Sequence, residues 1–303
     1  MHTLYKYYSS LPYDYFKSPT IKLSQLALLN DPFEHYMPTQ AIHESMKKIF
    51  GDNYNEQIDH IRMFKKSYKF INATKGIVSL SETHRNLLMW THYADQHKGL
   101  CIGYRHDFLS SLPLPEQYNK IVDKFHPIKV NYDRVRFDIN DLDFSEIEQE
   151  MDYINSILLK SLTTKSDDWM YEKEHRCITP LKWADDILIK DPNKLSQIST
   201  PDYKYILSMD ANKGKNARDS LAVENKYKFL LDNIGQDQQS ILLKRISPQK
   251  ISSIYFGSRM PKNIKNEFIK SIKENIDEYQ HIKIFEYKVD DTNYELNRKQ
   301  IYI

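Results

Sequence analysis

Two glutamates and an arginine alternate in the segment 168–178, which carries the densest set of chemically useful side chains in the sequence. If the second half of this segment is a β-strand, Glu172, Glu174 and Arg176 project from one face at intervals of roughly 7 Å. Two carboxylates there can stabilise a developing positive charge while the guanidinium holds an anionic group, which suits chemistry on a phosphorylated sugar. A solvated row of charges on a strand is an equally frequent explanation of the same pattern.

The composition excludes several other kinds of site. The 303 residues include 43 basic and 41 acidic side chains, so the net charge of +2 neither requires nor excludes a nucleic-acid partner. The seven glycines are too widely spaced for a phosphate-binding P-loop or a three-glycine dinucleotide motif. Any nucleotide must therefore be held by side chains and ordinary backbone.

The cysteines and the hydropathy pattern indicate the cellular compartment of the protein. Cys101 and Cys177 lack the spacing of a metal site or of a disulfide framework, which indicates a reducing interior. The start of the chain does not resemble a secretion signal, and no apolar run approaches the roughly 20 residues needed to cross a bilayer. We expect a soluble cytoplasmic protein with no membrane partner.

Strand and helix patterns follow one another without regular alternation, which favours the α+β class over a doubly wound sheet. We expect one α+β domain spanning residues 1–303. Residues 183–220 are polar and rich in turn-forming residues, so we expect a mobile surface insertion there. The expected strands cover 2–7, 20–23, 75–80, 100–104, 127–132, 172–179, 239–246, 250–256 and 282–289, and the expected helices cover 42–70 with a break near Gly51, 85–97, 145–164 and the residues after Pro261.

Three further segments carry candidate site residues. Ser79 and Ser81 end an expected strand and precede a helix, where free N–H groups can receive a phosphate or a carboxamide, although Ser81 can equally cap that helix. Trp90 and Tyr93 lie within one helical turn and could form an aromatic wall for a flat heterocycle, although core packing is the more frequent role of such a pair. The loop 30–34 fits either a capped turn or a ligand-binding loop.

The sequence resembles the bacterial family known as domain of unknown function 2971, whose name implies no activity. The similar stretches occur in the family's order and run across nearly the whole chain. They are Leu4–Tyr7, Leu29–Glu34, Ser79–Glu82, Met89–Ala94, Lys98–Gly103, Trp169–Arg176 and Ile254–Gly257.

A second resemblance is to the ADP-ribosyltransferase superfamily. It lies in the order of an N-terminal strand with a cationic residue, a strand ending in Ser-x-Ser, and a later strand with Glu-x-Glu. The resemblance implies a mixed, mainly antiparallel split sheet with inserted helices, and NAD as a substrate. Lys6, or Tyr7 beside it, would contact the NAD ribose or phosphate where the superfamily usually has arginine or histidine. Ser79 and Ser81 would brace the site, with leucine between them where threonine is usual.

The same resemblance assigns the two glutamates. Glu174 would hydrogen-bond the nicotinamide ribose and favour its oxocarbenium-like transition state, and Glu172 would orient the acceptor. Cleavage of the glycosidic bond of NAD also needs a flat wall for nicotinamide and donors for the diphosphate. Trp90 or Tyr93 can supply the wall, and Lys6 or Arg176 can supply the donors.

We therefore expect an NAD-consuming ADP-ribosyltransferase-like enzyme, of the kind found among toxins and phage-defence effectors, that modifies an unknown protein or nucleic acid or hydrolyses NAD. Glu174→Gln should abolish nicotinamide release and leave the thermal unfolding midpoint nearly unchanged. The oligomeric state is open.

Two alternatives remain. One is a non-catalytic module that binds nucleic acid or protein through the charged strand and is indifferent to NAD. The other is a metal-dependent nuclease, which Lys173 disfavours because it would lie on the opposite strand face from Glu172 and Glu174, although Glu34, Glu82 and Glu174 could converge.

Overall fold

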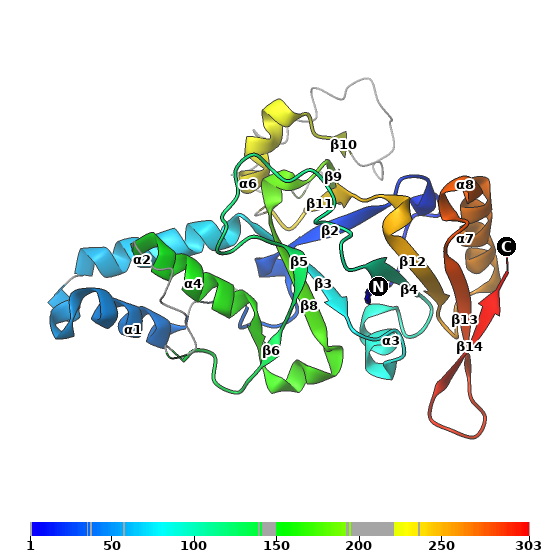
Figure 1. Ribbon diagram of the computed structural model, residues 1–303, viewed down its shortest axis with the longest axis horizontal. Helices are drawn as coiled ribbons and strands as arrows, with labels where there is room; N and C mark the ends of the chain where they lie inside the picture. Colours follow the sequence, from blue (N-terminus) through cyan, green and yellow to red (C-terminus); the bar gives the residue numbers. More distant parts are fainter. Residues whose placement is uncertain are drawn as a thin grey trace.

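The computed structural model describes residues 2–34, 36, 38–56, 58–138, 140, 150–191, 194, 221–235 and 237–302. Over these residues the protein has an α+β fold in which helices flank a large, mainly antiparallel sheet (Figure 1). The expected fold class is confirmed at this level. No helix in the described ranges combines the length and the apolar character needed to cross a bilayer.

The strands follow the expected positions closely in the first half of the chain. Both strands expected before residue 30 are present, and so are the two strands expected on either side of the helix at 85–97. The strands are β1 (Thr3–Tyr8), β2 (Thr20–Gln25), β3 (Lys75–Ser81), β4 (Leu100–Arg105), β5 (Lys124–Lys129), β6 (Asn131–Tyr132), β7 (Thr164–Lys165), β8 (Glu174–Pro180), β9 (Asp186–Ile189), β10 (Leu221–Ala222), β11 (Ser240–Arg245), β12 (Ile251–Phe256), β13 (Lys283–Val289) and β14 (Leu296–Ile301).

The helices are short, and several are 3₁₀ turns. Gly51, with φ of +73°, separates the first two α-helices at the expected break. The α-helices are α1 (Thr39–Phe50), α2 (Ile58–Ala73), α3 (Leu87–Tyr93), α4 (Glu150–Leu162), α6 (Leu231–Ile234), α7 (Lys262–Glu274) and α8 (Ile276–Tyr279), and the 3₁₀ helices are η1 (Tyr15–Lys17), η2 (Leu26–Leu28), η3 (Asp52–Glu56), η5 (Asp167–Glu172), η6 (Leu181–Trp183), η8 (Asn225–Leu230) and η9 (Pro248–Lys250).

The main sheet runs in the order β10-β9-β11-β2-β3-β1-β4-β12-β13-β14, and β8 and β5 join it through β3. Within this sheet the described neighbours are antiparallel, except for the parallel pair β12–β13. The mainly antiparallel character that we expected is therefore present.

The sheet forks at β3. One edge of β3 pairs with β8 along its whole length. The other edge pairs with β2 only at Gly76 and Ile77 and with β1 only at Ser81. Because neither strand pairs with the residues between, β1 and β2 leave a gap beside the middle of β3.

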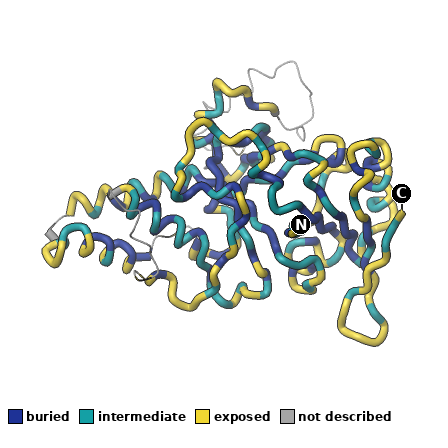
Figure 2. Tube along the Cα trace, viewed as in Figure 1, coloured by how far each residue is buried: buried dark blue, intermediate teal, exposed yellow. Residues whose placement is uncertain are grey.

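Each face of the β3–β8 pair is covered by a different layer. Ile77 and Ile178 face a cluster formed with α1, α2 and α4, the arm at the left of Figure 1. Val78 and Cys177 face the larger core to which α7 and α8 contribute. Figure 2 shows the buried residues following the sheet, while the outer part of the arm and the β13–β14 turn are exposed. Side chains alternate between the two faces along β3 and β8. On the face that carries Ile77, the positions beyond the part covered by the arm can therefore be occupied by polar side chains.

Two expectations need correction. The segment 183–220 was expected to be an irregular insertion, but Trp183 is buried in η6 and Asp186–Ile189 forms β9, paired with β10 and β11. Its remaining part lies almost wholly outside the described residues. The charged strand was expected from residue 172 but begins at Glu174, because Lys173 adopts a left-handed conformation with φ of +47°.

Candidate active site

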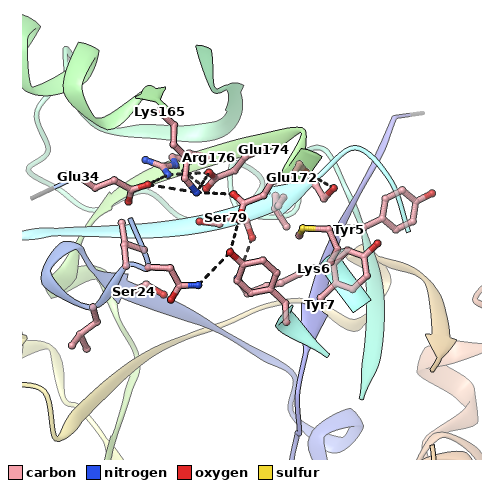
Figure 3. A pocket seen from close by; sticks show the side chains of 17 residues that line it. Tyr5, Lys6, Tyr7, Ser24, Glu34, Ser79, Lys165, Glu172, Glu174 and Arg176 are labelled. Carbon is pink, nitrogen blue, oxygen red and sulfur yellow. Dashed lines mark hydrogen bonds and ion pairs between the residues drawn. The ribbon is translucent and has the colours of Figure 1, made fainter. Parts of the chain in front are cut away.

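A cavity of about 230 Å³ lies in the fork between β1 and β2 (Figure 3). Segments that are far apart in the sequence supply its walls: β1, the end of β2, β3, α3, the loop before α1, and the region around β7 and β8. Eight of the nine residues expected from the sequence line it: Lys6, Tyr7, Ser79, Ser81, Tyr93, Glu172, Glu174 and Arg176.

Trp90 is the ninth residue, and it does not line the cavity. Its side chain is fully buried, donates from its indole nitrogen to the His84 carbonyl at 2.9 Å, and packs edge-on against Tyr7 and Tyr287. Trp90 is therefore a core residue that supports Tyr7 from behind. Of the two residues expected to form an aromatic wall, Tyr93 lines the cavity and Trp90 does not, while Tyr5 and Tyr7 of β1 also line it.

Glu174 and Arg176 form a two-point ion pair inside the protein. Arg176 donates from Nε to Glu174 Oε1 at 2.8 Å and from Nη2 to Glu174 Oε2 at 2.9 Å, and its Nη1 donates to the Leu162 carbonyl at 2.8 Å. Only 3% of Glu174 and 1% of Arg176 are exposed. The solvated charge row is therefore excluded for these two residues.

This environment keeps Glu174 ionised. Burial by itself would raise the pKa of the carboxyl, but the charges of Arg176 and Lys165 and hydrogen bonds from Arg176 and Ser79 outweigh it and lower the pKa to about 2. The pKa of Arg176 is raised, because Glu174 and Glu34 overcome the effect of its burial. The pair is charged at neutral pH.

Glu172 reaches the same cavity from the end of η5 and not from the strand. Lys165 donates to Glu172 Oε2 at 2.6 Å, and the Tyr93 hydroxyl donates to Oε1. Ser81 donates from Oγ to the Glu172 carbonyl at 2.7 Å, so this serine fixes the η5 end and does not cap α3, whose cap is Asn86. Burial raises the pKa of Tyr93, and the Glu172 charge adds to that shift.

Lys165 was missed as a site residue in the sequence, and Glu34 was considered there only in the loop 30–34 and as a carboxylate of the nuclease alternative. Lys165, on the two-residue strand β7, lies 2.6 Å from Glu172, 3.4 Å from Glu174 and 3.7 Å from Glu34. Glu34 accepts from Arg176 Nη2 at 2.5 Å. No sequence pattern distinguishes Lys165 from other lysines, whereas Glu34 lies in the loop 30–34 that the sequence had singled out.

The loop 30–34 proves to be both a capped turn and part of the cavity. Asp31 accepts from the Phe33 backbone N–H at 2.9 Å, as a turn requires. Asn30 lines the cavity and donates to the Tyr93 hydroxyl at 3.2 Å. Arg136 holds the loop from outside by donating to the Phe33 and Tyr36 carbonyls at 2.8 and 2.6 Å.

Lys6 is the cation on the β1 side. Its Nζ donates to the Ser79 carbonyl at 3.0 Å, beside the stretch of β3 that neither β1 nor β2 pairs. Burial lowers the pKa of Lys6 to about 8, and the nearby charge of Lys22 acts in the same direction against that of Glu174. Lys6 is therefore a half-buried cation whose charged form an anion would favour.

Three carboxylates in the cavity contact ammonium or guanidinium groups. Within the described ranges, no group of three histidine, cysteine, aspartate or glutamate side chains is arranged to hold a metal ion. Cys101 and Cys177 are free and buried, and burial raises the pKa of both thiols. The arrangement suits electrostatic chemistry on a charged organic substrate.

Residues 89–177 match the family described as protein of unknown function (DUF2971). The resemblance to this family is thereby confirmed over a segment that supplies Tyr93, Lys165, Glu172, Glu174 and Arg176. The similar stretches that we noted elsewhere in the chain lie outside the match. No curated protein and no solved structure matches the chain at a significant level.

Proposed function

We propose that the cavity cleaves the bond between nicotinamide and ribose in NAD and transfers ADP-ribose to a protein, a nucleic acid or water. The observation that carries this proposal is the convergence of Lys6, Ser79 and Glu174 on one small cavity in a sheet fork. These residues come from three separate strands, and nothing in their local sequence requires them to meet. Their order along the chain is the order of the ADP-ribosyltransferase motifs.

The placement of the carboxylates in the cavity suits the reaction. As the bond breaks, its electron pair goes to the nicotinamide nitrogen and the ribose ring becomes positive. When ionised, Glu34, Glu172 and Glu174 balance the charges of Lys6, Lys165 and Arg176, so stabilisation of a cationic ribose depends on its lying beside the carboxylates and not on the net charge of the walls. Arg176 also fixes the Glu174 carboxylate, so orienting this carboxylate costs little free energy during the reaction.

The size of the cavity indicates which part of NAD it can enclose. About 230 Å³ is small beside the several hundred Å³ typical of sites that enclose a whole ligand. We assign the cavity to nicotinamide and its ribose, with the ring beside Tyr93. The diphosphate then lies near Lys6 and Lys22, whose positive charges repel each other in the absence of an anion.

An ADP-ribosyltransferase-like fold, a cytoplasmic location, and action as a toxin or phage-defence effector belong to the same proposal. Depletion of NAD or modification of an essential macromolecule would halt growth. We favour this chemistry over a metal-dependent nuclease because Lys165 and Arg176 occupy the centre of the carboxylate cluster, and their charges oppose the entry of a divalent cation. A non-catalytic binding module is an outcome of the experiment below.

The test is nicotinamide release from NAD, measured by chromatography with wild type, Glu174→Gln and a matched control. The control is Asp123→Asn, which breaks the buried Lys75–Asp123 ion pair of 2.6 Å outside the cavity. Wild type should release nicotinamide, and Glu174→Gln should lower the rate by about 10²- to 10³-fold per folded molecule. Asp123→Asn should lose stability but keep its rate per folded molecule.

Equal rates in wild type and Glu174→Gln would remove Glu174 from the mechanism. Absence of both nicotinamide release and NAD binding by wild type in calorimetry would contradict the proposed function and favour the binding module.

A further inference from the structure

Glu34 differs from the other carboxylates of the cavity in having a free oxygen. Its Oε1 accepts from Arg176 and lies 3.7 Å from Lys165. Its Oε2 is buried and has no hydrogen-bond partner among the described residues. A buried carboxylate oxygen without a donor is costly, so this position is suited to a proton or to a donor brought by a ligand.

The other two carboxylates have no comparable free oxygen. Both oxygens of Glu174 accept from Arg176, and one also accepts from Lys165. Glu172 accepts from Tyr93 on one oxygen and from Lys165 on the other. Glu34 is thus the carboxylate of this cluster with capacity to take up a proton.

The environment separates Glu34 and Glu174 although both contact the same guanidinium. Burial raises the pKa of Glu34, and the Glu174 charge adds to this, while Arg176 and Lys165 oppose it without cancelling it. The pKa of Glu174 is lowered to about 2. Two carboxylates driven in opposite directions by their surroundings are the usual mark of a divided acid–base role.

We propose that Glu34 is the general base that removes the proton from the attacking nucleophile in this cavity, while Glu174 remains a fixed charge. This inference rests on the proposed NAD cleavage and adds the residue that handles the proton. The groups that face Glu34 are Arg176 and Glu174 from β8 and Lys165 from β7. Arg136 holds the backbone on either side of it.

In hydrolysis, the oxygen of water forms a bond to ribose C1′ as the bond from C1′ to the nicotinamide nitrogen breaks. The electron pair of the broken bond neutralises the pyridinium ring, and neutral nicotinamide leaves. One water proton passes to Glu34 and then to solvent. The products are ADP-ribose, nicotinamide and one proton, so atoms and charge balance. A hydroxyl or amine acceptor would replace water without changing the role of Glu34.

The test compares wild type and Glu34→Gln for NAD hydrolysis as a function of pH, with and without sodium azide. Wild type should lose kcat/KM on the acidic side as Glu34 takes up a proton. Glu34→Gln should be about 10²-fold slower and should lack that acidic limb. Azide is an anionic nucleophile and needs no proton removed, so it should restore nicotinamide release by Glu34→Gln, with ADP-ribosyl azide as product, but not by Glu174→Gln.

Glu34→Asp separates chemistry from folding, because it keeps a charge for Arg176 and shortens the reach to the nucleophile. It should be slower than wild type but keep the acidic limb. Wild-type turnover with an unchanged pH profile in Glu34→Gln, or a failure of azide to restore that variant, would overturn the role of Glu34 alone. No turnover by wild type would overturn the NAD reaction and this inference together.

Discussion

Arg176 is the residue on which the ion network of the site depends. Its guanidinium contacts two carboxylates and the Leu162 carbonyl, and it is almost completely buried. A buried charge that loses its partner is far more costly than the net stabilisation given by the intact pair. The residues proposed for chemistry therefore also contribute to stability, which the sequence did not suggest.

Glu174→Gln should destabilise the protein. The structure revises our expectation of an unchanged unfolding midpoint, because the substitution leaves Arg176 without its two-point carboxylate partner. We expect a loss of about 3–5 kcal/mol in the free energy of unfolding at pH 7, measured by urea denaturation. A loss below about 1 kcal/mol would mean that Arg176 finds compensation elsewhere.

Through Glu174, the stability of the protein should depend on pH. The pKa of Glu174 is lowered from 4.5 to about 2 in the folded protein, so its stabilising contribution is present above pH 4.5 and is lost as the pH falls toward 2. Because the pKa of Glu34 is raised, its contribution to stability changes with pH in the opposite direction. Urea midpoints of wild type should therefore fall more steeply between pH 5 and 3 than those of Glu174→Gln, and parallel curves would contradict this linkage.

At the scale of elements, the turn after α3 fixes Tyr93 against the sheet. Asp95, Gln96 and His97 all have positive φ, and the Gly99 N–H donates to the Ala94 carbonyl at 2.8 Å. A Cβ at Gly99 would lie 2.1 Å from the Tyr8 carbonyl oxygen on β1. Only glycine allows this close approach between the α3 turn and β1.

We accordingly predict that Gly99→Ala forces the turn away from β1. The expected cost is about 1–3 kcal/mol in the free energy of unfolding, with a loss of nicotinamide release as Tyr93 shifts. Lys98→Ala, at an exposed neighbouring position, is the matched control and should change neither measurement appreciably. Full activity and stability in Gly99→Ala would show that α3 is not positioned by this turn.

The sequence predicted the elements whose patterns are long or sharply bounded. Strands such as β1, β3 and β4 alternate or are continuously apolar, and Gly51 separated α1 from α2. The short strand β9 was not predicted, because four residues are too few to show the periodicity of a strand. Glu172 was placed on a strand because nothing in the sequence reveals the left-handed turn at Lys173.

The lining of the cavity was predictable where chemistry and motif order coincide, as for Lys6, Ser79 and Glu174. Lys165 was not, because a lysine on a two-residue strand becomes a site residue only through the fold. Trp90 was misassigned because core packing and ligand stacking call for the same residue type at the same helical spacing. The fork itself follows from strand pairing, which one sequence does not determine.

At the scale of the whole molecule, the fork divides the sheet into two parts that each supply a wall. In the order of the sheet, the part β1-β4-β12-β13-β14 carries Lys6. The part β2-β11-β9-β10 carries the start of the loop that ends in Glu34. The charged cluster on β8 closes the third side. The cavity therefore exists only in the assembled fold, so unfolding of any one part should remove it.

The most direct measurement is a crystal structure of the wild-type protein soaked with benzamide adenine dinucleotide, in which a carbon–carbon bond replaces the bond to be cleaved. We predict that the benzamide ring lies beside Tyr93, that the adjoining ribose approaches Glu174, and that the diphosphate lies near Lys6. Density for the analogue elsewhere on the molecule, or an empty cavity at a saturating concentration, would contradict the claim that this fork is the site of NAD cleavage.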